Sequence, residues 1–508
     1  MIVRTGSEAV AGYLSDESAI FHAPSEMVEA VYLPEREEDV IQILREAQAA
    51  RRMVTVSGGG TGITGARVPL HGGVVMAMER MLAPAEHEGC ERVSLPDGAI
   101  YLNRREGIAH LPPGITLQGL EAALPREMLY PPDPTEQTAM LGGTAATNAS
   151  GARCFYYGAT RRWVEGLRVI LPSGERLILR RGEILAHGRT FQFRTEEGGD
   201  YRLGLPSYDS PEIKNSAGLY VRPGTDLVDL FIGSEGILGV ITGLTVRLTQ
   251  RRETISDLAF LGGEREAMRL VRDLRGLNGV LAIEYFDRYS LDFVREKYPG
   301  VAEGAKGAVF VEILESELCA LGELLKRYTL IEDWCAQSRE DVERLKDLRH
   351  ALPERVNEYL KEHESYKLGT DFAVPAHSFE EMLRRYRAVG ERFRRLFPRK
   401  GVHYVLFGHA GDCHLHFNFI TESREELEAA KGLYVELARS AISLGGTISG
   451  EHGVGKKRVV VDGREIPYLE LMYNHGTLLE IGAVKKALDP HLILNTGNIV
   501  PLEYLRNP

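Results

Sequence analysis

The first clear pattern of apolar and polar positions predicts a strand, a helix and a second strand over residues 28–57. VEAVYL at 28–33 has the character of a short strand. Apolar residues then recur at helical spacing through residues 40–47. The acidic residues at 35–39 suit a helix N-terminus, where the helix dipole favours negative charge. MVTVS at 53–57 follows as a buried strand, so the chain opens with an α/β unit.

The next apolar segments predict further strands up to about residue 250. WVEGLRVILPSGERLIL at 163–179 predicts a meander that turns at Pro172–Gly174. Residues 176–228 have mixed polarity, and we expect loops there. The apolar stretch 227–248 predicts a pair of strands around a turn at Gly233–Gly236.

After residue 250 the pattern changes to short strands that alternate with amphipathic helices, up to about residue 420. Ser378 and Glu381 have the spacing of a capping box at the start of one such helix. A long helix at about 422–444 is expected to end at Gly445–Gly446, because glycine commonly terminates helices. This half of the chain therefore predicts an antiparallel sheet layered with helices.

Length and composition narrow the function classes. A chain of 508 residues is too long for one ordinary core, and 44% apolar and 26% charged residues are typical of a globular protein. The net charge of −11 disfavours a nucleic-acid surface and a polybasic membrane anchor. Five scattered cysteines without a CxxC pair make a disulfide framework or an iron–sulfur site in this chain unexpected. No apolar run reaches the roughly 18 residues of a membrane-spanning helix, so we expect a cytoplasmic location.

A glycine-rich loop, GGGTGITG at Gly58–Gly65, follows the second predicted strand directly. Exposed main-chain N–H groups in such a loop can bind a pyrophosphate. The glycine spacing is not that of a Rossmann turn or a Walker loop. A second loop at Tyr130–Ala152 begins with three prolines and continues with small residues, which allow the close approach of a flat, extended ligand.

Histidines and carboxylates gather in two short glycine-bearing segments, GHAGDCHLH at 408–416 and SGEHGVG at 449–455. Imidazole with carboxylate is a ligand set for a zinc-like or manganese-like ion. His409 and His416 are seven residues apart, so a bend at Gly411–Asp412 must bring them together. His414 and His416 would instead share one face of a strand, and that pairing stays open.

Four motifs follow one another along the chain: the glycine loop, PPDP with GGTAATNASG, FIGSEGILGVIT, and the C-terminal ALDPHLILNTGNIVP. Together they resemble the FAD-binding domain of the vanillyl-alcohol oxidase / p-cresol methylhydroxylase (PCMH) superfamily. Within it the chain is similar to the branch of D-2-hydroxyacid dehydrogenases that contains D-lactate dehydrogenases and the flavin subunit of glycolate oxidase.

The resemblance implies an α+β fold with three parts. These are a PCMH-type FAD-binding domain of two α/β subdomains at 1–250, an antiparallel-sheet cap that binds substrate at 251–445, and a C-terminal segment at 446–508 that returns to the FAD site. Noncovalent FAD is implied, because the first loop lacks the histidine that attaches flavin in some relatives. The implied FAD-binding residues are Gly58, Gly59, Gly60, Thr61, Gly62, Thr64, Gly65, Pro131, Asp133, Gly142, Gly143, Thr144, Thr147, Asn148, Gly151, Ile241 and Asn495.

By the same resemblance, His409, His416 and Glu451 are the metal ligands, and His452 is the base. Two departures stand inside the metal motif: Cys413 replaces a glycine and His414 replaces an asparagine. His414 could add a hydrogen bond to substrate or compete as a ligand. For the substrate carboxylate, Arg349 is the first candidate and Lys367 the second, since an arginine fork suits a carboxylate.

The implied reaction oxidises a small D-2-hydroxy acid, such as D-lactate or glycolate, by hydride transfer to flavin. The implied acceptors are an electron-transfer flavoprotein, a cytochrome, a quinone or an iron–sulfur subunit, with any membrane association made through that acceptor. The competing interpretation is a flavin transferase like alkylglycerone-phosphate synthase, which GVGKKR at Gly453–Arg458 resembles. That family has a histidine at the position of Glu451, so Glu451 favours the dehydrogenase.

Overall fold

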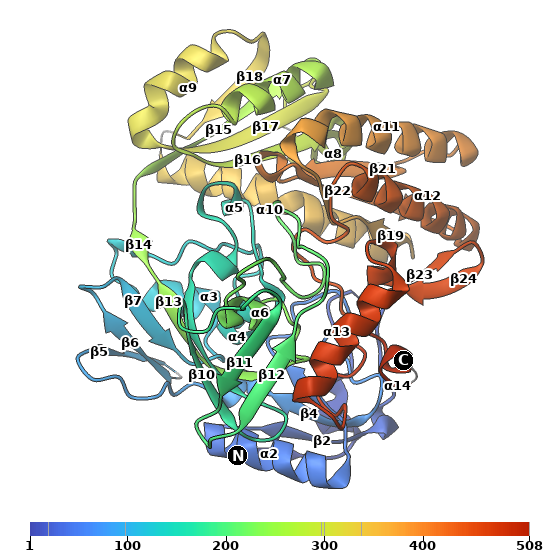
Figure 1. The fold of residues 1–508 in the computed structure, drawn as a ribbon. Coiled ribbons are helices and arrows are strands. Elements are labelled where there is room, and N and C mark those ends of the chain that lie inside the picture. The colour runs from blue at the N-terminus through green and yellow to red at the C-terminus, as the bar shows by residue number, and fades with distance from the viewer. Residues whose placement is uncertain (19, 97, 296, 299, 337, 507–508) are drawn as a thin grey trace.

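The protein has a lower part built from the first half of the chain and an upper part built mostly from the second half (Figure 1). The structure is a computed structural model. It describes residues 1–508 except 19, 97, 296, 299, 337 and 507–508. The side chains of 339, 342, 343, 346, 349 and 350 are also outside the description. The lower part is blue to green in Figure 1, and the upper part is yellow to orange.

The lower part contains a four-stranded and a six-stranded sheet. The first has the order β1-β2-β4-β3, in which β2, β4 and β3 are parallel and β1 is antiparallel to β2. The second has the order β10-β9-β13-β7-β6-β5 and is antiparallel. The strands of the first sheet are β1 (Ile2–Arg4), β2 (Val28–Leu33), β3 (Val54–Ser57) and β4 (Gly73–Ala77). Those of the second are β5 (Glu91–Leu95), β6 (Gly98–Asn103), β7 (Ile108–Leu111), β9 (Val164–Ile170), β10 (Arg176–Arg180) and β13 (Val240–Arg247).

Short elements connect and cover these sheets. The helices are α1 (Ser7–Val10), α2 (Glu37–Ala50), α3 (Leu117–Ala123), α4 (Leu141–Thr147), α5 (Cys154–Tyr157) and α6 (Leu227–Phe231). Two further strand pairs are β8 (Met128–Leu129) with β14 (Thr249–Gln250), and the hairpin of β11 (Thr190–Arg194) and β12 (Asp200–Gly204). The predicted strand, helix and strand of residues 28–57 are confirmed as β2, α2 and β3.

The upper part is one antiparallel sheet of order β18-β15-β17-β16-β21-β22-β19, with β20 also paired to β22. Its strands are β15 (Thr254–Leu261), β16 (Val280–Asp287), β17 (Gly307–Leu314), β18 (Leu330–Cys335), β19 (Tyr366–Gly369), β20 (Phe372–Ala373), β21 (Tyr404–Gly408) and β22 (His414–Thr421). Its helices are α7 (Glu264–Leu274), α8 (Arg288–Arg295), α9 (Leu318–Leu325), α10 (Arg339–Glu362), α11 (Phe379–Leu396) and α12 (Arg424–Ser443).

Both faces of the central strands β16, β17 and β21 are buried, and this explains the continuous apolar runs in them, whereas the edge strands β18 and β19 are more exposed. Ala259 and Leu261 of β15 pack with α7, whereas Leu258 and Phe260 point to the opposite face and pack with α8 and α10. The predicted antiparallel sheet with helices is therefore confirmed. Buried strands leave no room for unpaired charge, so a carboxylate such as Glu284 on β16 must have a partner.

After α12 the chain returns to the lower part. It forms β23 (Arg458–Val461), β24 (Arg464–Pro467), α13 (His475–Leu488) and α14 (Leu502–Arg506), drawn in red beside the lower part in Figure 1. Leu494 pairs with Val54 of β3, so the last segment joins the first sheet. The boundaries near residues 250 and 445 stay predictions.

Three local predictions are wrong. Residues 227–231 form α6 and not a strand, because Asp226 caps the helix by accepting a hydrogen bond from Val228 N. The expected loops at 176–228 contain the β11–β12 hairpin, whereas β9 and β10 confirm the meander predicted at 163–179. Ser378 does not form a capping box, since its hydroxyl donates to the carbonyl of Leu444 instead. The capping box that does form joins Ser338 and Asp341 at the start of α10.

Candidate functional site

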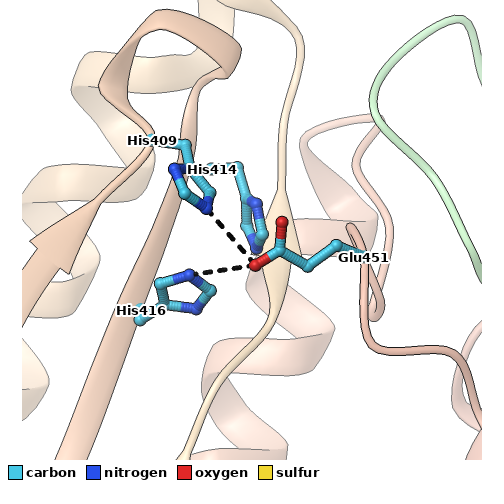
Figure 2. A group of neighbouring side chains, drawn as sticks. All are labelled: His409, His414, His416 and Glu451. Carbon is cyan, nitrogen blue, oxygen red and sulfur yellow. Dashed lines mark hydrogen bonds and ion pairs between the residues drawn. The ribbon is translucent and has the colours of Figure 1, made fainter. Parts of the chain in front are cut away.

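The two histidine-bearing segments meet at the end of β21 and the start of β22 (Figure 2). His409 Nε2 and His416 Nε2 each lie 3.3 Å from the same oxygen, Oε1 of Glu451. Glu451 comes from the loop after α12. The bend expected between the histidines is present: Ala410–Asp412 form a 3₁₀ turn, and Cys413 follows in the left-handed region with φ of 55°.

His409 is fixed by a second carboxylate. Its Nδ1 lies 2.7 Å from Oε1 of Glu284, the buried acid on β16, so Nδ1 carries the proton in that bond and Nε2 faces Glu451. Burial disfavours the charged imidazole, but the carboxylates of Glu284 and Glu451 together outweigh burial and raise the pKa of His409 to about 10. A carboxylate on the far nitrogen is the usual way in which proteins orient a metal-binding histidine.

His416 is oriented in the same way by a carbonyl. Its Nδ1 lies 3.4 Å from the carbonyl oxygen of Thr370, which can only accept, so Nδ1 is the donor there. With both ring nitrogens protonated, His409 donates through Nε2 to Oε1 of Glu451, and Nε2 of His416 faces the same oxygen. A divalent cation can displace these protons, so the two imidazole nitrogens and the carboxylate oxygen form a suitable ligand set. Ligand atoms about 2.0–2.1 Å from one zinc ion lie roughly 3.0–3.4 Å from each other, and the observed 3.3 Å separations fit.

His414 lies in the same cluster, and one ligand atom from each of His409, His414, His416 and Glu451 lies within 4.8 Å of the others. Its side chain is fully buried, and its Nε2 is 2.8 Å from Oδ1 of Asp371. Burial and the nearby ammonium of Lys214 lower the pKa of His414 to about 3, so the ring is neutral. Nε2 of His414 is therefore committed to Asp371, whereas its buried Nδ1 has no hydrogen-bond partner among the described residues.

Asp371 organises the loop that carries Glu451, a role that the sequence did not reveal. Its Oδ2 accepts hydrogen bonds from Ser449 Oγ at 2.6 Å and from the main-chain N–H of His452 at 2.9 Å. Burial opposes its charge, but His452 and His414 outweigh burial and hold the pKa of Asp371 far below its ordinary value. Asp371 lies in TDFAVP at Thr370–Pro375, where nothing in the sequence pattern marks the carboxylate.

His452 completes this arrangement. Its Nδ1 is 3.3 Å from Oδ1 of Asp371, and its Nε2 is 3.7 Å from Oε1 of Glu451. Burial lowers the pKa of His452 to about 4, against the effect of the two carboxylates. Its side chain keeps 29% of its surface exposed. A neutral, oriented and accessible imidazole is what a general base requires.

Lys214 is a second residue that sequence reasoning missed. Its Nζ lies 2.7 Å from Oε2 of Glu451 and 3.8 Å from Oδ2 of Asp412, and only 1% of its side chain is exposed. Lys214 and Asp412 also line a cavity of about 760 Å³, together with Asn148 and Phe155 of the lower part. Lys214 lies in the stretch of mixed polarity where no periodicity pointed to burial.

The structure does not bring the two proposed carboxylate-binding residues to this cluster by any contact that it describes. Lys367 is on β19, opposite Ile420 of β22, and its Nζ is 3.3 Å from Oδ1 of Asn357. Burial lowers the pKa of Lys367. Arg349 falls within α10, where its side chain lies outside the described residues. Both assignments stay predictions.

The glycine loop between β3 and β4 has the properties of an anion site. Within the described part of the chain, the main-chain N–H groups of residues 59–64 make no hydrogen bond. A Cβ atom at Gly62 or at Gly143 would meet no heavy atom within 4 Å, so the backbone borders open space at both loops. A Cβ at Gly58 would lie 3.8 Å from the Cα of Gly143, which places the two predicted FAD loops side by side. These loops fit a pyrophosphate and a flat ligand.

The second loop contains the short helix α4 and is held by its own side chains. Thr144 and Thr147 bond carbonyls one turn back, and Asn148 caps α4 in the left-handed region. Asp133 accepts from Arg153 N at 3.1 Å. Asn495 accepts from Val56 N at 2.7 Å and donates to the carbonyl of Glu235 at 2.9 Å. The remaining predicted residues, Pro131, Gly142, Gly151 and Ile241, lie in or beside these segments.

The segment after His452 joins the histidine–carboxylate cluster of His409, His416 and Glu451 to the glycine loop. Lys456 N donates to the carbonyl of Thr64 at 2.9 Å, and a Cβ at Gly455 would lie only 2.1 Å from that oxygen. Glu235 accepts from the N–H groups of Val454 and Gly455, both at 2.7 Å. The histidine–carboxylate cluster is thus fixed beside the loop that fits the cofactor.

Two family models match this chain in the order that the motifs predict. The FAD binding domain matches residues 28–180, and the C-terminal domain of FAD linked oxidases matches residues 254–499. The chain belongs to the FAD-linked oxidases. This FAD-linked oxidase is an oxidoreductase that uses FAD, as its first loops indicated.

Three curated relatives are similar to this FAD-linked oxidase over nearly their whole length. A D-lactate dehydrogenase of Archaeoglobus fulgidus is 29% identical over 96% of this chain and 95% of its own. The glycolate oxidase subunit GlcD of Bacillus subtilis is 27% identical over 93% and 89%. A D-2-hydroxyglutarate dehydrogenase of Xanthomonas citri pv. viticola is 28% identical over 92% and 89%.

Solved structures with the same fold support the predicted PCMH-type architecture. An alkyldihydroxyacetonephosphate synthase has a TM-score of 0.66 at 16% identity, covering 97% of this chain and 82% of the other. A 4-ethylphenol oxidase from Gulosibacter chungangensis has a TM-score of 0.64 at 17% identity, covering 98% and 94%. At these identities the likeness concerns the fold alone. Among the described helices of the FAD-linked oxidase, none has the length and apolar character needed to cross a bilayer.

Proposed function

We propose that this protein oxidises a small D-2-hydroxy acid to the 2-oxo acid, with noncovalent FAD and a divalent zinc or manganese ion. Its relatives include a D-lactate dehydrogenase and a D-2-hydroxyglutarate dehydrogenase, and this supports the proposed substrate class. The electrons pass to an acceptor other than a nicotinamide: an electron-transfer flavoprotein, a cytochrome, a quinone or an iron–sulfur subunit.

One observation carries the proposal. The imidazoles of His409 and His416 converge with Glu451 at 3.3 Å separations, directly beside the neutral imidazole of His452. Three protein ligands leave coordination positions open, as catalytic metal sites do. A 2-hydroxy acid offers adjacent hydroxyl and carboxylate oxygens to fill them.

Different residues of the chain accept the proton and bind the ion. Asp371 holds Nδ1 of His452, so Nε2 presents its lone pair to the substrate hydroxyl and takes its proton. Glu451, His409 and His416 hold the ion, with Glu284 fixing the ring of His409. When bound, FAD takes the hydride from the hydroxyl-bearing carbon, and the divalent ion stabilises the developing negative charge on oxygen. The substrate thus loses one hydride, to FAD, and one proton, to His452, and becomes the 2-oxo acid.

The substrate carboxylate requires a cation of its own. Arg349 is our first assignment because its planar fork matches a carboxylate in two hydrogen bonds, and Lys367 is the second. Replacing Arg349 with Lys keeps the charge and loses the fork, so KM should rise about 10-fold or more.

Anaerobic flavin bleaching with a panel of 2-hydroxy acids tests this function. D-lactate, glycolate and D-2-hydroxyglutarate are compared with L-lactate at equal concentration. We expect at least one acid other than L-lactate to bleach the flavin, and L-lactate to do so far more slowly. If none of the acids reduces the flavin in metal-loaded protein, the proposed function is wrong, and a transferase without net redox change becomes the better interpretation.

A further inference from the structure

The two oxygens of Glu451 have different partners. Oε1 faces the Nε2 atoms of His409 and His416, and Oε2 lies 2.7 Å from Nζ of Lys214. The Lys214 ammonium is shielded from solvent, since 1% of its side chain is exposed. A buried ion pair of this kind holds the carboxylate in one orientation.

Three acceptors of the protein surround the ammonium of Lys214. Its Nζ donates a hydrogen bond to the carbonyl oxygen of Gly151 at 3.3 Å. The contact with Oε2 of Glu451 at 2.7 Å is a close ion pair, and Oδ2 of Asp412 at 3.8 Å is beyond hydrogen-bond distance. Charge attraction therefore directs Lys214 towards Glu451.

The geometry points to a positioning role, which rests on the function proposed above. We propose that Lys214 restricts Glu451 to coordination through Oε1 alone. This leaves open positions on the ion for the two substrate oxygens. The positive charge of Lys214 also weakens the hold of the site on its cation.

The sign of the effect on metal affinity separates this role from a merely structural one. A structural lysine, once removed, would loosen the site and weaken metal binding. Removal of a positioning lysine instead frees Oε2 to coordinate, leaves a buried carboxylate unpaired in the metal-free protein, and removes a repelling charge that lies 2.7 Å from the other oxygen of Glu451. At an effective dielectric constant of about 20, removing a unit charge so near a divalent ion changes the affinity by more than about tenfold.

The experiment titrates Co²⁺ into metal-free, FAD-loaded protein by calorimetry and records the visible spectrum of the bound ion. Lys214→Met is compared with Lys326→Met, which removes an exposed lysine paired with Glu323. We expect Lys214→Met to bind Co²⁺ at least about tenfold more tightly. Its Co²⁺ absorption should be weaker because the coordination number is higher, and kcat should fall. Lys326→Met should keep the wild-type spectrum and stay within about threefold in affinity.

Lys214→Arg provides the conservative comparison, because it keeps the positive charge and the donors. Its Co²⁺ affinity and spectrum should stay close to those of the wild type. If Lys214→Met loses FAD or fails to fold, Lys214→Gln gives the same comparison with an amide donor and no charge.

Two failures are distinguishable. A wild-type protein that binds no Co²⁺ at millimolar concentration overturns the metal-assisted function, and the role of Lys214 with it. A wild-type protein that binds Co²⁺ while Lys214→Met binds it equally or more weakly, with an unchanged spectrum, overturns the role of Lys214 alone.

Discussion

Nδ1 of His452 lies 3.3 Å from Oδ1 of Asp371, a residue of the upper part that also accepts the main-chain N–H of His452. Asp371 thus fixes both the backbone and the ring of the proposed base. This pairing leaves Nε2 as the nitrogen that takes a proton. Asp371 therefore orients the proposed base although the two residues are far apart in sequence.

Replacing His452 with Ala should slow flavin reduction by about 10²- to 10⁴-fold, the usual loss for a missing general base. FAD and metal contents should not change, because His452 contacts neither glycine loop and Glu451 remains. Part of the rate should return at high pH, where hydroxide can take the proton. Stopped-flow bleaching measures the rate, and His475→Ala, at the exposed start of α13, is the control. A wild-type rate in His452→Ala would move the base elsewhere, with His414 the next candidate.

Asp371→Asn should lower both stability and turnover. The change removes a buried charge that holds Ser449 Oγ and His452 N, and the loss of such charge-assisted bonds costs about 2–4 kcal/mol. Thermal unfolding followed by circular dichroism measures the first effect. Asp462→Asn is the matched control, because that side chain is 86% exposed and asparagine tolerates its left-handed turn. Equal melting temperatures for the two variants would contradict the role of Asp371.

The pH dependence should follow the lowered pKa of His452, which is about 4 rather than the ordinary 6.5. Protonation removes the base, so the rate of flavin reduction should fall only as the pH drops towards 4. The rate should stay on a plateau from about pH 5.5 to 8, well above that pKa. Single-turnover bleaching across this range checks it. An acid limb centred near 6.5 would show that His452 is not buried or is not the base.

The FAD should be released completely by acid precipitation. The glycine loop has no histidine to form a covalent bond, and its free N–H groups bind by hydrogen bonding alone. The absorbance of the supernatant and of the washed pellet measures the division. Yellow colour retained in the pellet would mean a covalent link through another residue.

Much of the fold could be predicted because its signals are local. The spacing of apolar residues predicted β2, α2 and β3, and the alternation of strands and helices after residue 250. The hairpin β11–β12 was missed although TFQFR at 190–194 alternates as a strand should. Helix α6 was missed because five residues inside an apolar run are too short to show a helical period.

In the candidate site, too, residues in local motifs could be predicted, and residues that depend on long-range contacts could not. The proposed ligand set of His409, His416 and Glu451 came from short motifs that the family resemblance made specific. Lys214 could not be found, because its burial depends on contacts with the upper part, far away in sequence. Glu284 did carry a signal: it is the one acid inside the apolar stretch VLAIEYF, and a charge at such a position needs a partner.

The most direct test of the account compares flavin reduction in metal-free and metal-reconstituted protein. The FAD-loaded protein is treated with chelator, its metal content is verified by elemental analysis, and it is mixed anaerobically with the best acid of the panel. We expect reduction to be at least about 10²-fold slower without metal, and to recover with zinc or manganese in wild type but not in Glu451→Ala. Full-rate bleaching in verified metal-free protein would contradict the account.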